Sequence, residues 1–216
     1  MGITKAGGLR TMREDRYNEP AFWPAVLTEG PVRLRPIRKR DGQAWQALRE
    51  QNEDWLGPWD ATSPTGEVPP NFHAYARSCL RAARQGLMLP WVIEYEGLLV
   101  GQLSVNGIAR GAAQQAAIGY WVSEHVAGRG IAPTAVAMAF DHAINVGGLH
   151  RLEVAIRPEN KRSLRVADKL GFRPEGLRLR SLHVDGDWRD HLIFALTAEE
   201  VPGGLLARWR SVQAAT

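Results

Sequence analysis

The chain has very little cysteine and no long apolar run. Cys79 is its single cysteine, so the 216 residues cannot form an internal disulfide or a cysteine-rich metal site. No apolar run approaches the ~20 residues that cross a bilayer, and the N-terminus lacks the apolar core of a signal peptide. These absences predict a cytoplasmic protein that does not contact a membrane.

The chain also lacks a strong charge of one sign. Its net charge of +4 favours anionic partners in general, but it does not choose between a phosphorylated cofactor, an acidic protein and RNA. No RNA-recognition signature accompanies the charge, so direct nucleic-acid binding is not expected. The histidines at 73, 125, 142, 150 and 191 have no metal-ligand spacing, so we expect solvated or core roles for them and no metal.

The hydrophobic pattern predicts one folded domain with an N-terminal extension. Residues 1–28 show no sustained period, and we interpret them as a partly disordered tail. The whole chain has an ordinary composition, with 44% hydrophobic and 23% charged residues, and its length suits one core. The sequence therefore predicts a single domain over 29–216.

The order of predicted elements is β, α, α, three strands, α, β, α, β, β. Glu96-Gly97 and Asp185-Gly186 predict tight hairpin turns, and Asn160 and Gly171 predict the start and end of one helix. A single crossover unit predicts an α+β fold and not a doubly wound one. In chain order we predict a strand at 31–37, a helix after Asp41, a helix at 71–85, two strands within 91–108, a strand at 116–122, a helix at 133–146, a strand at 151–156, a helix at 160–170, strands at 173–184 and 188–196, and a further helix at 203–213.

The stretch "AGRGIAPTA", residues 127–135, joins a predicted strand to a predicted helix. Gly128 and Gly130 can adopt positive φ and carry no Cβ, so the loop backbone can lie close to a ligand. The N–H groups of 128–132 can then converge into an anion-binding concavity, with the charge of Arg129 at its rim. This geometry predicts a pyrophosphate cradle.

The helix start supports the same interpretation. Pro133 suits the first helical position and would make Ala132 the cap, leaving the N–H groups of Thr134 and Ala135 without partners. A P-loop is excluded because Gly-Lys-Ser/Thr is missing, and the dinucleotide pattern G-x-G-x-x-G fails at Pro133. The alternative is a tight strand-to-helix connection that binds nothing.

Two neighbouring segments favour the ligand-binding interpretation. Asn160 and Ser163 lie on one side of a helix start. Gly119 within the strand 118–122 predicts a β-bulge that splays this strand from the one at 151–156. An amide-bearing linker can pair with the exposed strand edges. A diphosphate at one end of an amide-bearing arm describes coenzyme A.

At this point the chain resembles the GCN5-related N-acetyltransferase (GNAT) family, and within it the Rim-type ribosomal-protein N-terminal acetyltransferases. The resemblance covers roughly residues 30–198 and depends on "AGRGIA", on "NKRS" with "KLGF", and on "DGDWRDHLIFAL". Ala127 departs from the Gln or Arg that many relatives have. The resemblance implies a mostly antiparallel sheet flanked by helices, with a splayed pair of strands that holds the cofactor.

The resemblance further implies direct transfer of an acetyl group from acetyl-CoA to an amine. The strand amide of Val122 would polarise the thioester carbonyl, and the Ser163 hydroxyl would donate a hydrogen bond to the departing thiolate. The residues implied in cofactor binding are Tyr120, Trp121, Val122, Ala127, Gly128, Arg129, Gly130, Ile131, Ala132, Thr134, Asn160 and Ser163. Arg162, Arg165 and Lys169 would either meet the 3′-phosphate or form a solvated face.

The acceptor is expected to be a protein N-terminus, such as that of a ribosomal protein. Some Rim-type enzymes carry a glutamate base where this chain has Leu182, and the neighbouring His183 is a weak replacement. Poor base assistance favours an α-amine, with a pKa near ~8, over a lysine near ~10.4. The alternatives are a small-molecule amine acetyltransferase and a non-catalytic acyl-CoA-binding regulator.

The loop "WLGPWD" is the candidate acceptor pocket. Trp55 and Trp59 could line it, with Asp60 or Glu53 attracting the ammonium group, or both tryptophans could be core plugs under a loop. The sequence leaves the choice between a monomer and a homodimer open.

Overall fold

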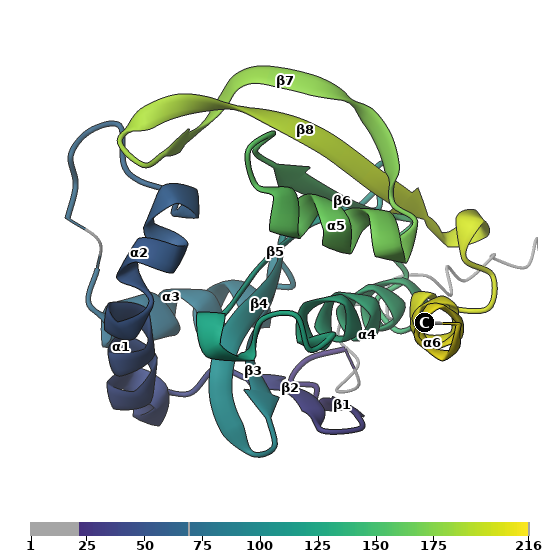
Figure 1. Ribbon diagram of the computed structural model, residues 1–216, viewed down its shortest axis with the longest axis horizontal. Helices are drawn as coiled ribbons and strands as arrows, with labels where there is room; N and C mark the ends of the chain where they lie inside the picture. The colour runs from purple at the N-terminus through teal and green to yellow at the C-terminus, as the bar shows by residue number, and fades with distance from the viewer. Residues whose placement is uncertain (1–21, 69, 216) are drawn as a thin grey trace, which may run out of the picture.

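An eight-stranded mixed sheet with helices on both faces forms the framework (Figure 1). The computed structural model describes residues 22–68 and 70–215. The strand order is β1-β2-β3-β4-β5-β6-β8-β7, and every neighbouring pair is antiparallel except β5 and β6. The strands are β1 Leu27–Glu29, β2 Val32–Pro36, β3 Met88–Tyr95, β4 Leu98–Ala109, β5 Gln115–Val122, β6 Arg151–Ile156, β7 Arg173–Val184 and β8 Asp187–Thr197. The helices are α1 Gly42–Gln51, α2 Glu53–Leu56, α3 Phe72–Arg84, α4 Ile131–Asn145, α5 Lys161–Leu170 and α6 Leu205–Ala214. The predicted α+β class, with a mostly antiparallel sheet flanked by helices, is confirmed.

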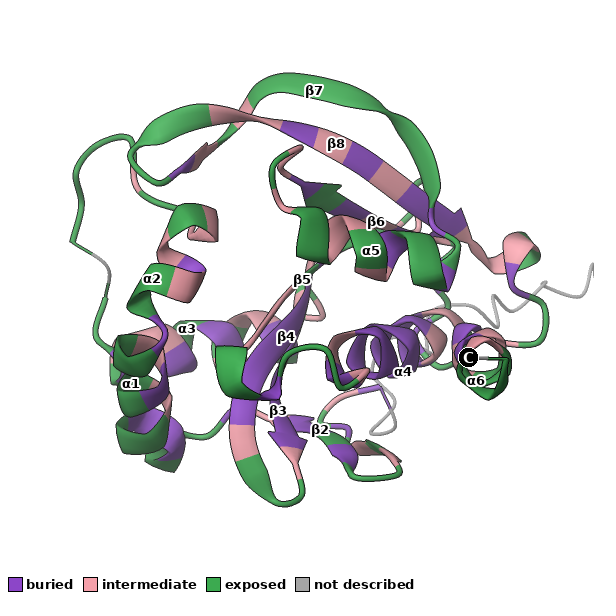
Figure 2. Ribbon diagram, in the orientation of Figure 1, coloured by how far each residue is buried: buried purple, intermediate pink, exposed green. Residues whose placement is uncertain are grey.

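The two faces of the sheet carry separate apolar clusters, because side chains alternate along each strand. The larger cluster packs α4, α5 and α6 against one face, and the smaller one packs α1 and α3 against the other. Figure 2 shows α4 buried over most of its length and β7, at the sheet edge, exposed. Along β5, Tyr120 packs on the larger cluster, while Trp121 meets Trp45 of α1 on the opposite face. The sheet thus separates two environments.

The two predicted hairpin turns and the predicted ends of the helix that starts after Asn160 are confirmed. Glu96 and Gly97 have φ of 51° and 83°, and Asp185 and Gly186 have 51° and 75°, as tight hairpin turns require. The Asn160 side chain accepts a hydrogen bond from the third residue of α5. Turn and cap residues of this kind predict the structure correctly because each one satisfies a backbone requirement within four residues of its own position.

The fold begins earlier than the pattern predicts. Phe22 and Ala25 are buried in the larger cluster, and β1 pairs Leu27 with Leu34 of β2. The last part of the predicted tail 1–28 therefore packs onto the domain, since the Phe22 ring also stacks on His142 of α4. The rest of the predicted tail, residues 1–21, lies outside the described residues.

The predicted bulge at Gly119 is wrong, but the predicted splay is confirmed. Residues Ala117 to Val122 of β5 pair with β4 in unbroken register, and the irregularity lies between Asn106 and Ala109 of β4. β5 pairs with β6 only through residues 115–117 and 151–153. Beyond that point the two strands diverge, so the gap arises from their short shared ladder.

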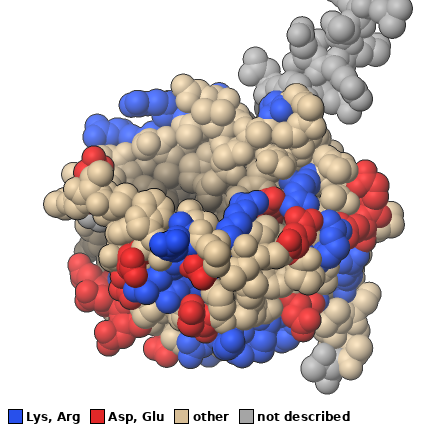
Figure 3. All heavy atoms as spheres, turned by 90° about the horizontal axis from the view of Figure 1, so that it is seen from above, with Lys and Arg blue, Asp and Glu red and all other residues tan. Residues whose placement is uncertain are grey.

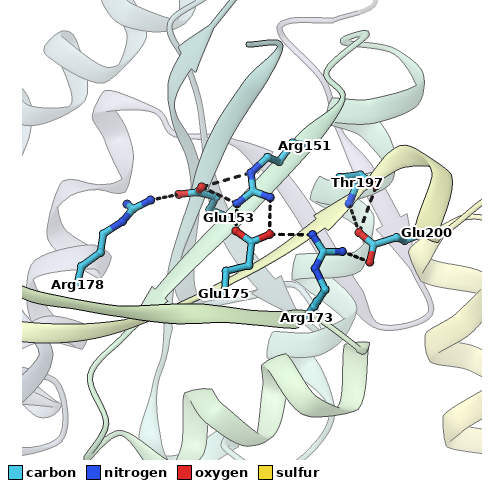
Figure 4. Close-up of polar contacts among 7 residues, drawn as sticks. All are labelled: Arg151, Glu153, Arg173, Glu175, Arg178, Thr197 and Glu200. Atoms are coloured by element: carbon cyan, nitrogen blue, oxygen red, sulfur yellow. Dashed lines mark hydrogen bonds and ion pairs between the residues drawn. The ribbon is translucent and has the colours of Figure 1, made fainter.

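An ion-pair network connects β6 with β7, which forms one edge of the sheet (Figure 4). Arg151 of β6 contacts Glu153 and Glu175, and Glu175 also accepts from Arg173 of β7 at 2.7 Å. Arg173 in turn pairs with Glu200, which follows β8. The network joins β6, β7 and the segment that follows β8, and none of its residues lines the cleft described below, so it is a structural feature.

The described residues contain neither a membrane-spanning helix nor a metal-binding cluster. No helix there is long and apolar enough to cross a membrane. No group of three or more His, Cys, Asp or Glu side chains in the described ranges is arranged to hold a metal ion.

Candidate active site

A cleft of about 630 Å³ opens where β5 and β6 diverge. The start of α4, one face of α5 and the segment around α2 complete its walls. One continuous cleft therefore brings together residues from α2, β5, α4, β6, α5 and β8, the last of which contributes His191. The sequence-predicted residues that line it are Trp55, Trp59, Asp60, Tyr120, Trp121, Val122, Ala127, Gly128, Gly130, Ile131, Ala132, Asn160 and Ser163.

The loop before α4 forms one end of the cleft from main-chain atoms. Gly128 and Gly130 have φ of 83° and 78°, in the left-handed region that glycine tolerates. α4 begins at Ile131 with Gly130 as its N-cap, so the predicted cap at Ala132 is corrected. Pro133 is the third helical residue, where its missing N–H still costs no intrahelical bond.

The N–H groups of residues 128–132 are available to a ligand. They donate no hydrogen bond to any residue that the structure describes, whereas the Ala127 N–H donates to Glu124 O at 2.9 Å. Free N–H groups at a helix start attract anions, and the helix dipole adds to the attraction. This end of the cleft therefore has the donors that a diphosphate requires.

The two glycines of this loop face different surroundings. A Cβ added to Gly128 would have no atom within 4 Å, whereas one on Gly130 would lie 3.4 Å from Trp209 and from Gln213 of α6. Gly128 lies open to the cleft. Gly130 keeps α4 and α6 in close contact.

Two predicted cofactor contacts do not line the cleft. The Thr134 hydroxyl donates to Gly130 O at 2.8 Å and accepts from Trp209 Nε1 at 2.8 Å, so it is used inside the protein. The Thr134 N–H also donates to Gly130 O, because the helix begins two residues earlier than predicted. Arg129 is exposed at the loop and is absent from the cleft lining.

The edge of β5 presents to the cleft main-chain groups that are not bonded to β4. Ser123 N donates to Val100 O at 2.8 Å, so Val122 and its partner Gly101 form a non-hydrogen-bonded pair. The N–H and C=O of Val122 therefore point away from β4 and into the cleft. By the same alternation, those of Tyr120 point there too.

The edge of β6 faces β5 across the cleft with the same kind of groups. Ala198 N donates to His150 O at 2.9 Å, which makes Arg151 and Thr197 a non-hydrogen-bonded pair. Every second pair along an antiparallel ladder is non-hydrogen-bonded, so Ala155 and Ile193 also form such a pair. The N–H and C=O of Ala155 therefore point away from β8. Both walls can thus pair with an amide-bearing chain lying between them.

The start of α5 holds Ser163 in the cleft. Asn160 Oδ1 accepts from Ser163 N at 3.0 Å, and Asn160 O accepts from Leu164 N at 3.0 Å. Because its oxygens cap the helix, Asn160 offers its side-chain NH₂ to the cleft. The predicted meeting of Asn160 and Ser163 on one side is confirmed.

The Tyr120 hydroxyl is the unexplained polar atom of the site. It is buried, and no described residue is within hydrogen-bond geometry of it. Burial raises the pKa of Tyr120 to about 12, and the Ser163 hydroxyl beside it offsets part of that rise. A buried hydroxyl without a partner is costly in the free protein, so its presence beside Ser163 calls for a ligand.

The tryptophan loop forms the other end of the cleft. Trp55 Nε1 donates to Val122 O at 3.0 Å, and the Arg162 guanidinium lies 3.9 Å from the Trp55 ring. Arg157 lies 5.4 Å from the Trp59 ring and donates to Pro58 O at 2.7 Å. Both tryptophans are partly exposed cleft walls, which excludes the alternative of core plugs.

Asp60 is already paired within the protein. Its carboxylate forms an ion pair with Arg49 of α1. The Arg49 guanidinium also lies 5.3 Å from the Trp121 ring, so the pair links the loop to the sheet. Asp60 therefore offers a neutralised carboxylate to the cleft.

His191 lines the cleft, whereas His183, the candidate base from the sequence, does not. His183 Nδ1 contacts Thr62 Oγ1 at 2.7 Å, its ring packs on Trp188, and it does not line the cleft. His191 is 4% exposed and does line the cleft. Sequence reasoning missed it because only the pairing of β8 with β6 brings it there.

Basic side chains outnumber acidic ones along the cleft. Arg162, Arg165 and Lys169 of α5 line it together with Arg157. In the space-filling view, lysine and arginine side chains border a hollowed surface (Figure 3). The cleft therefore attracts a polyanion.

Comparisons with known proteins agree with this geometry. The family model described as "Acetyltransferase (GNAT) domain" matches residues 32–173. A solved structure, Mycobacterium smegmatis RimJ in complex with CoA-disulfide, has a TM-score of 0.83 and 40% identity, covering 89% of this chain and 96% of that one.

Two curated proteins extend the comparison. The [Ribosomal protein uS5]-alanine N-acetyltransferase of Escherichia coli is 26% identical over 82% of this chain and 93% of that protein. The probable N-acetyltransferase YjcK of Bacillus subtilis is 39% identical over 45% of this chain, a match that spans 54% of its own length.

Proposed function

The chain belongs to the GNAT acetyltransferase family, and we propose that it acetylates the N-terminal α-amine of a protein, with a ribosomal protein as the favoured class. As a GNAT enzyme it uses acetyl-CoA as co-substrate. The observation that carries the proposal is that the anion-binding loop, the open Val122 N–H and Ser163 line one cleft with the tryptophan loop.

The residues present fit coenzyme A. The free N–H groups of 128–132 would hold the diphosphate, and the edges of β5 and β6 would pair with the amides of the arm. Arg165 and Lys169 would meet further phosphate charge. When bound, acetyl-CoA supplies an acetyl thioester.

The residues at the centre of the cleft match the needs of acyl transfer. The Val122 N–H is directed to stabilise charge on the thioester oxygen, fixed by its ladder and by the Trp55 bond to Val122 O. Ser163 donates to the departing sulfur, with the Tyr120 hydroxyl beside it. A thiol with a pKa near ~8.5 leaves with such modest assistance.

The electrostatics of the cleft favour a protein N-terminus over a polyamine. A polycation would meet Arg157 and Arg162, while Asp60 is neutralised by Arg49. An α-amine, with a pKa near ~8, needs about 3 kcal/mol less than a lysine to present its neutral form. Trp55 and Trp59 suit the flat backbone and small side chains of a peptide's first residues.

The test is a panel of acceptors followed by release of free thiol and by mass spectrometry. Peptides with N-terminal alanine or serine are compared with the same peptides blocked at the N-terminus and with spermidine. We expect acetylation of the free α-amines only. Turnover of blocked peptides at internal lysine, or of spermidine alone, would contradict the acceptor class.

The variant Ser163→Ala separates the enzyme from a non-catalytic regulator. We expect it to keep coenzyme A affinity within about twofold and to lose about tenfold or more in kcat. Tight binding of acetyl-CoA by the wild-type protein without thiol release would favour the regulator.

A further inference from the structure

His191 lies on the side of the sheet opposite to Ser163. Leu192 and Phe194 of β8 pair with Ile156 and Val154, whose side chains join the α4–α5 cluster. Side chains alternate along a strand, so His191 points to the other face. Trp121 of β5 also points to that face, toward α1.

The cleft therefore has a separate polar group on each side of the strand gap. Tyr120 and Ser163 stand on the α5 side, and His191 stands on the side of the tryptophan loop. In a direct transfer the amine adds to the acetyl carbon from one face of the thioester plane, so the group that takes its proton must lie on that face, apart from the group that assists the sulfur. The tryptophan loop, the proposed acceptor wall, follows α1 along the chain, so His191 lies on the side where the proposed acceptor would enter.

The contacts of His191 fix which ring nitrogen carries the proton. Its Nδ1 lies 3.0 Å from Arg189 O and 3.2 Å from Ser181 Oγ. A carbonyl oxygen only accepts, so Nδ1 must donate. In the neutral ring Nε2 then has a free lone pair, and no described residue occupies it.

We propose that His191 Nε2 accepts the proton of the acceptor ammonium, an inference that rests on the proposed function. The ring is pre-oriented by the Arg189 carbonyl and by Ser181 of β7, as second partners orient catalytic histidines elsewhere. Ser181 is a positioning residue. Leu182, which stands where some Rim-type enzymes carry a glutamate base, and His183, the weak replacement, have no part in this arrangement.

The charges around His191 are compatible with a neutral ring near neutral pH. Burial lowers the pKa of His191 below its ordinary value, and the Arg189 carbonyl opposes this. The Arg157 charge lowers the pKa further, while Asp190 and Glu159 raise it. From β7, Arg178 pairs with His191 in register but directs its guanidinium to Glu153 at 3.2 Å.

The proposed step balances as follows. One proton of the substrate ammonium passes to Nε2, which leaves a neutral amine. The amine nitrogen forms the new C–N bond to the acetyl carbon while the C–S bond breaks. The sulfur leaves with that electron pair and takes the second amine proton, and the imidazolium returns its proton to solvent.

The test compares His191→Asn with a matched control on the same hairpin, His183→Asn. Asparagine preserves a donor to Arg189 O and removes Nε2. His183 lies outside the cleft, so its replacement changes no cleft group. Both variants are first checked for an unchanged melting temperature and unchanged coenzyme A affinity.

The pH dependence of kcat/KM gives the sharpest readout, measured with one peptide that has a free N-terminus. Wild-type protein and His183→Asn should be nearly flat between about pH 6.5 and 8, because ammonium and neutral His191 together form the reactive state. In His191→Asn, log kcat/KM should rise with unit slope toward the amine pKa near ~8. The loss should reach about tenfold or more at pH 6.5 and shrink above pH 8.

A second readout does not depend on turnover. Nitrogen NMR of the free protein should find the His191 ring protonated on Nδ1 at pH 7, with a pKa below that of an ordinary histidine. A ring protonated on Nε2, or parallel pH profiles for wild type and His191→Asn, would overturn this inference alone. Absence of α-amine turnover in the wild-type protein would instead contradict the proposed function, and the inference would fail with it.

Discussion

The two ends of the cleft are built from different materials. At the cofactor end, binding groups belong to the main chain: the N–H groups of 128–132 and the edges of β5 and β6. At the proposed acceptor end the lining groups belong to side chains, among them Trp55, Trp59 and His191. On the proposed function, the first end would hold a diphosphate that every acyl-CoA shares, and the second end would hold a variable acceptor.

This difference explains which changes each end tolerates. Main-chain donors survive most substitutions, so the cofactor end fails only where an added side chain fills the space or bends the loop. Side-chain walls change with every substitution. Substitutions in the tryptophan loop should therefore change which acceptor is preferred, while the affinity for coenzyme A stays constant.

The largest effect is expected from Gly128→Glu. Its added carboxylate would enter open space in the cleft and repel a diphosphate, weakening coenzyme A binding by about a hundredfold or more. Gly111→Glu is the matched control, because Gly111 also has positive φ (70°) and open surroundings. Calorimetry measures the affinities.

Both glycine variants should lose about 1 kcal/mol of unfolding free energy, because a non-glycine residue is strained at positive φ. Equal loss of affinity in the two would contradict the assignment of the loop. A weak effect in Gly128→Glu would place the diphosphate elsewhere.

Tyr120→Phe should have opposite effects on stability and rate. Removing a buried hydroxyl without a partner should raise the unfolding free energy by about 1 kcal/mol. If the hydroxyl assists Ser163 with the departing sulfur, kcat should fall by about tenfold. A more stable variant with wild-type kcat would show that the Tyr120 hydroxyl has no catalytic role.

Trp55→Phe sharpens the comparison from the acceptor end. It removes the hydrogen bond to Val122 O and weakens the stacking of Arg162. We expect KM for the peptide to rise by several-fold, with coenzyme A affinity unchanged within twofold. Trp188→Phe, at an exposed tryptophan on the β7–β8 hairpin, is the control and should change neither.

The smallest effect is expected from Glu175→Gln, outside the cleft. Its bond with Arg151 is the main cause that lowers the pKa of Glu175 to about 2. A lowered pKa contributes stability above the unfolded value near ~4.5, and that stability is lost as pH falls toward 2. The partly exposed network is worth at most about 1 kcal/mol at pH 7.

Thermal unfolding between pH 2 and 7 tests the role of Glu175. The variant should be slightly less stable at pH 7 and should converge with wild type near pH 2. Any change in kcat or in coenzyme A affinity would show that the network influences the cleft.

The cofactor end could be predicted from sequence because its signals are local. Gly128, Gly130 and Asn160 each satisfy a backbone requirement within a few residues of their own position. Errors of one or two residues remain: Pro133 tolerates any position in the first turn, so the helix start was misplaced and Thr134 was wrongly directed to the ligand.

The acceptor end could not be predicted to the same depth. His191 reaches the cleft through the pairing of β8 with β6, and Ser181 contacts His191 through an irregular register between Arg178 and Leu182. The Tyr120 hydroxyl likewise lies beside Ser163, which is more than forty residues away in the sequence. Such long-range juxtapositions leave no periodic signal.

The most direct test of the account is calorimetry of the wild-type protein with coenzyme A and with pantetheine, which lacks the diphosphate. Binding through the N–H groups of 128–132 predicts that coenzyme A binds about a hundredfold more tightly than pantetheine. Equal affinities for the two, or no heat with coenzyme A, would contradict it.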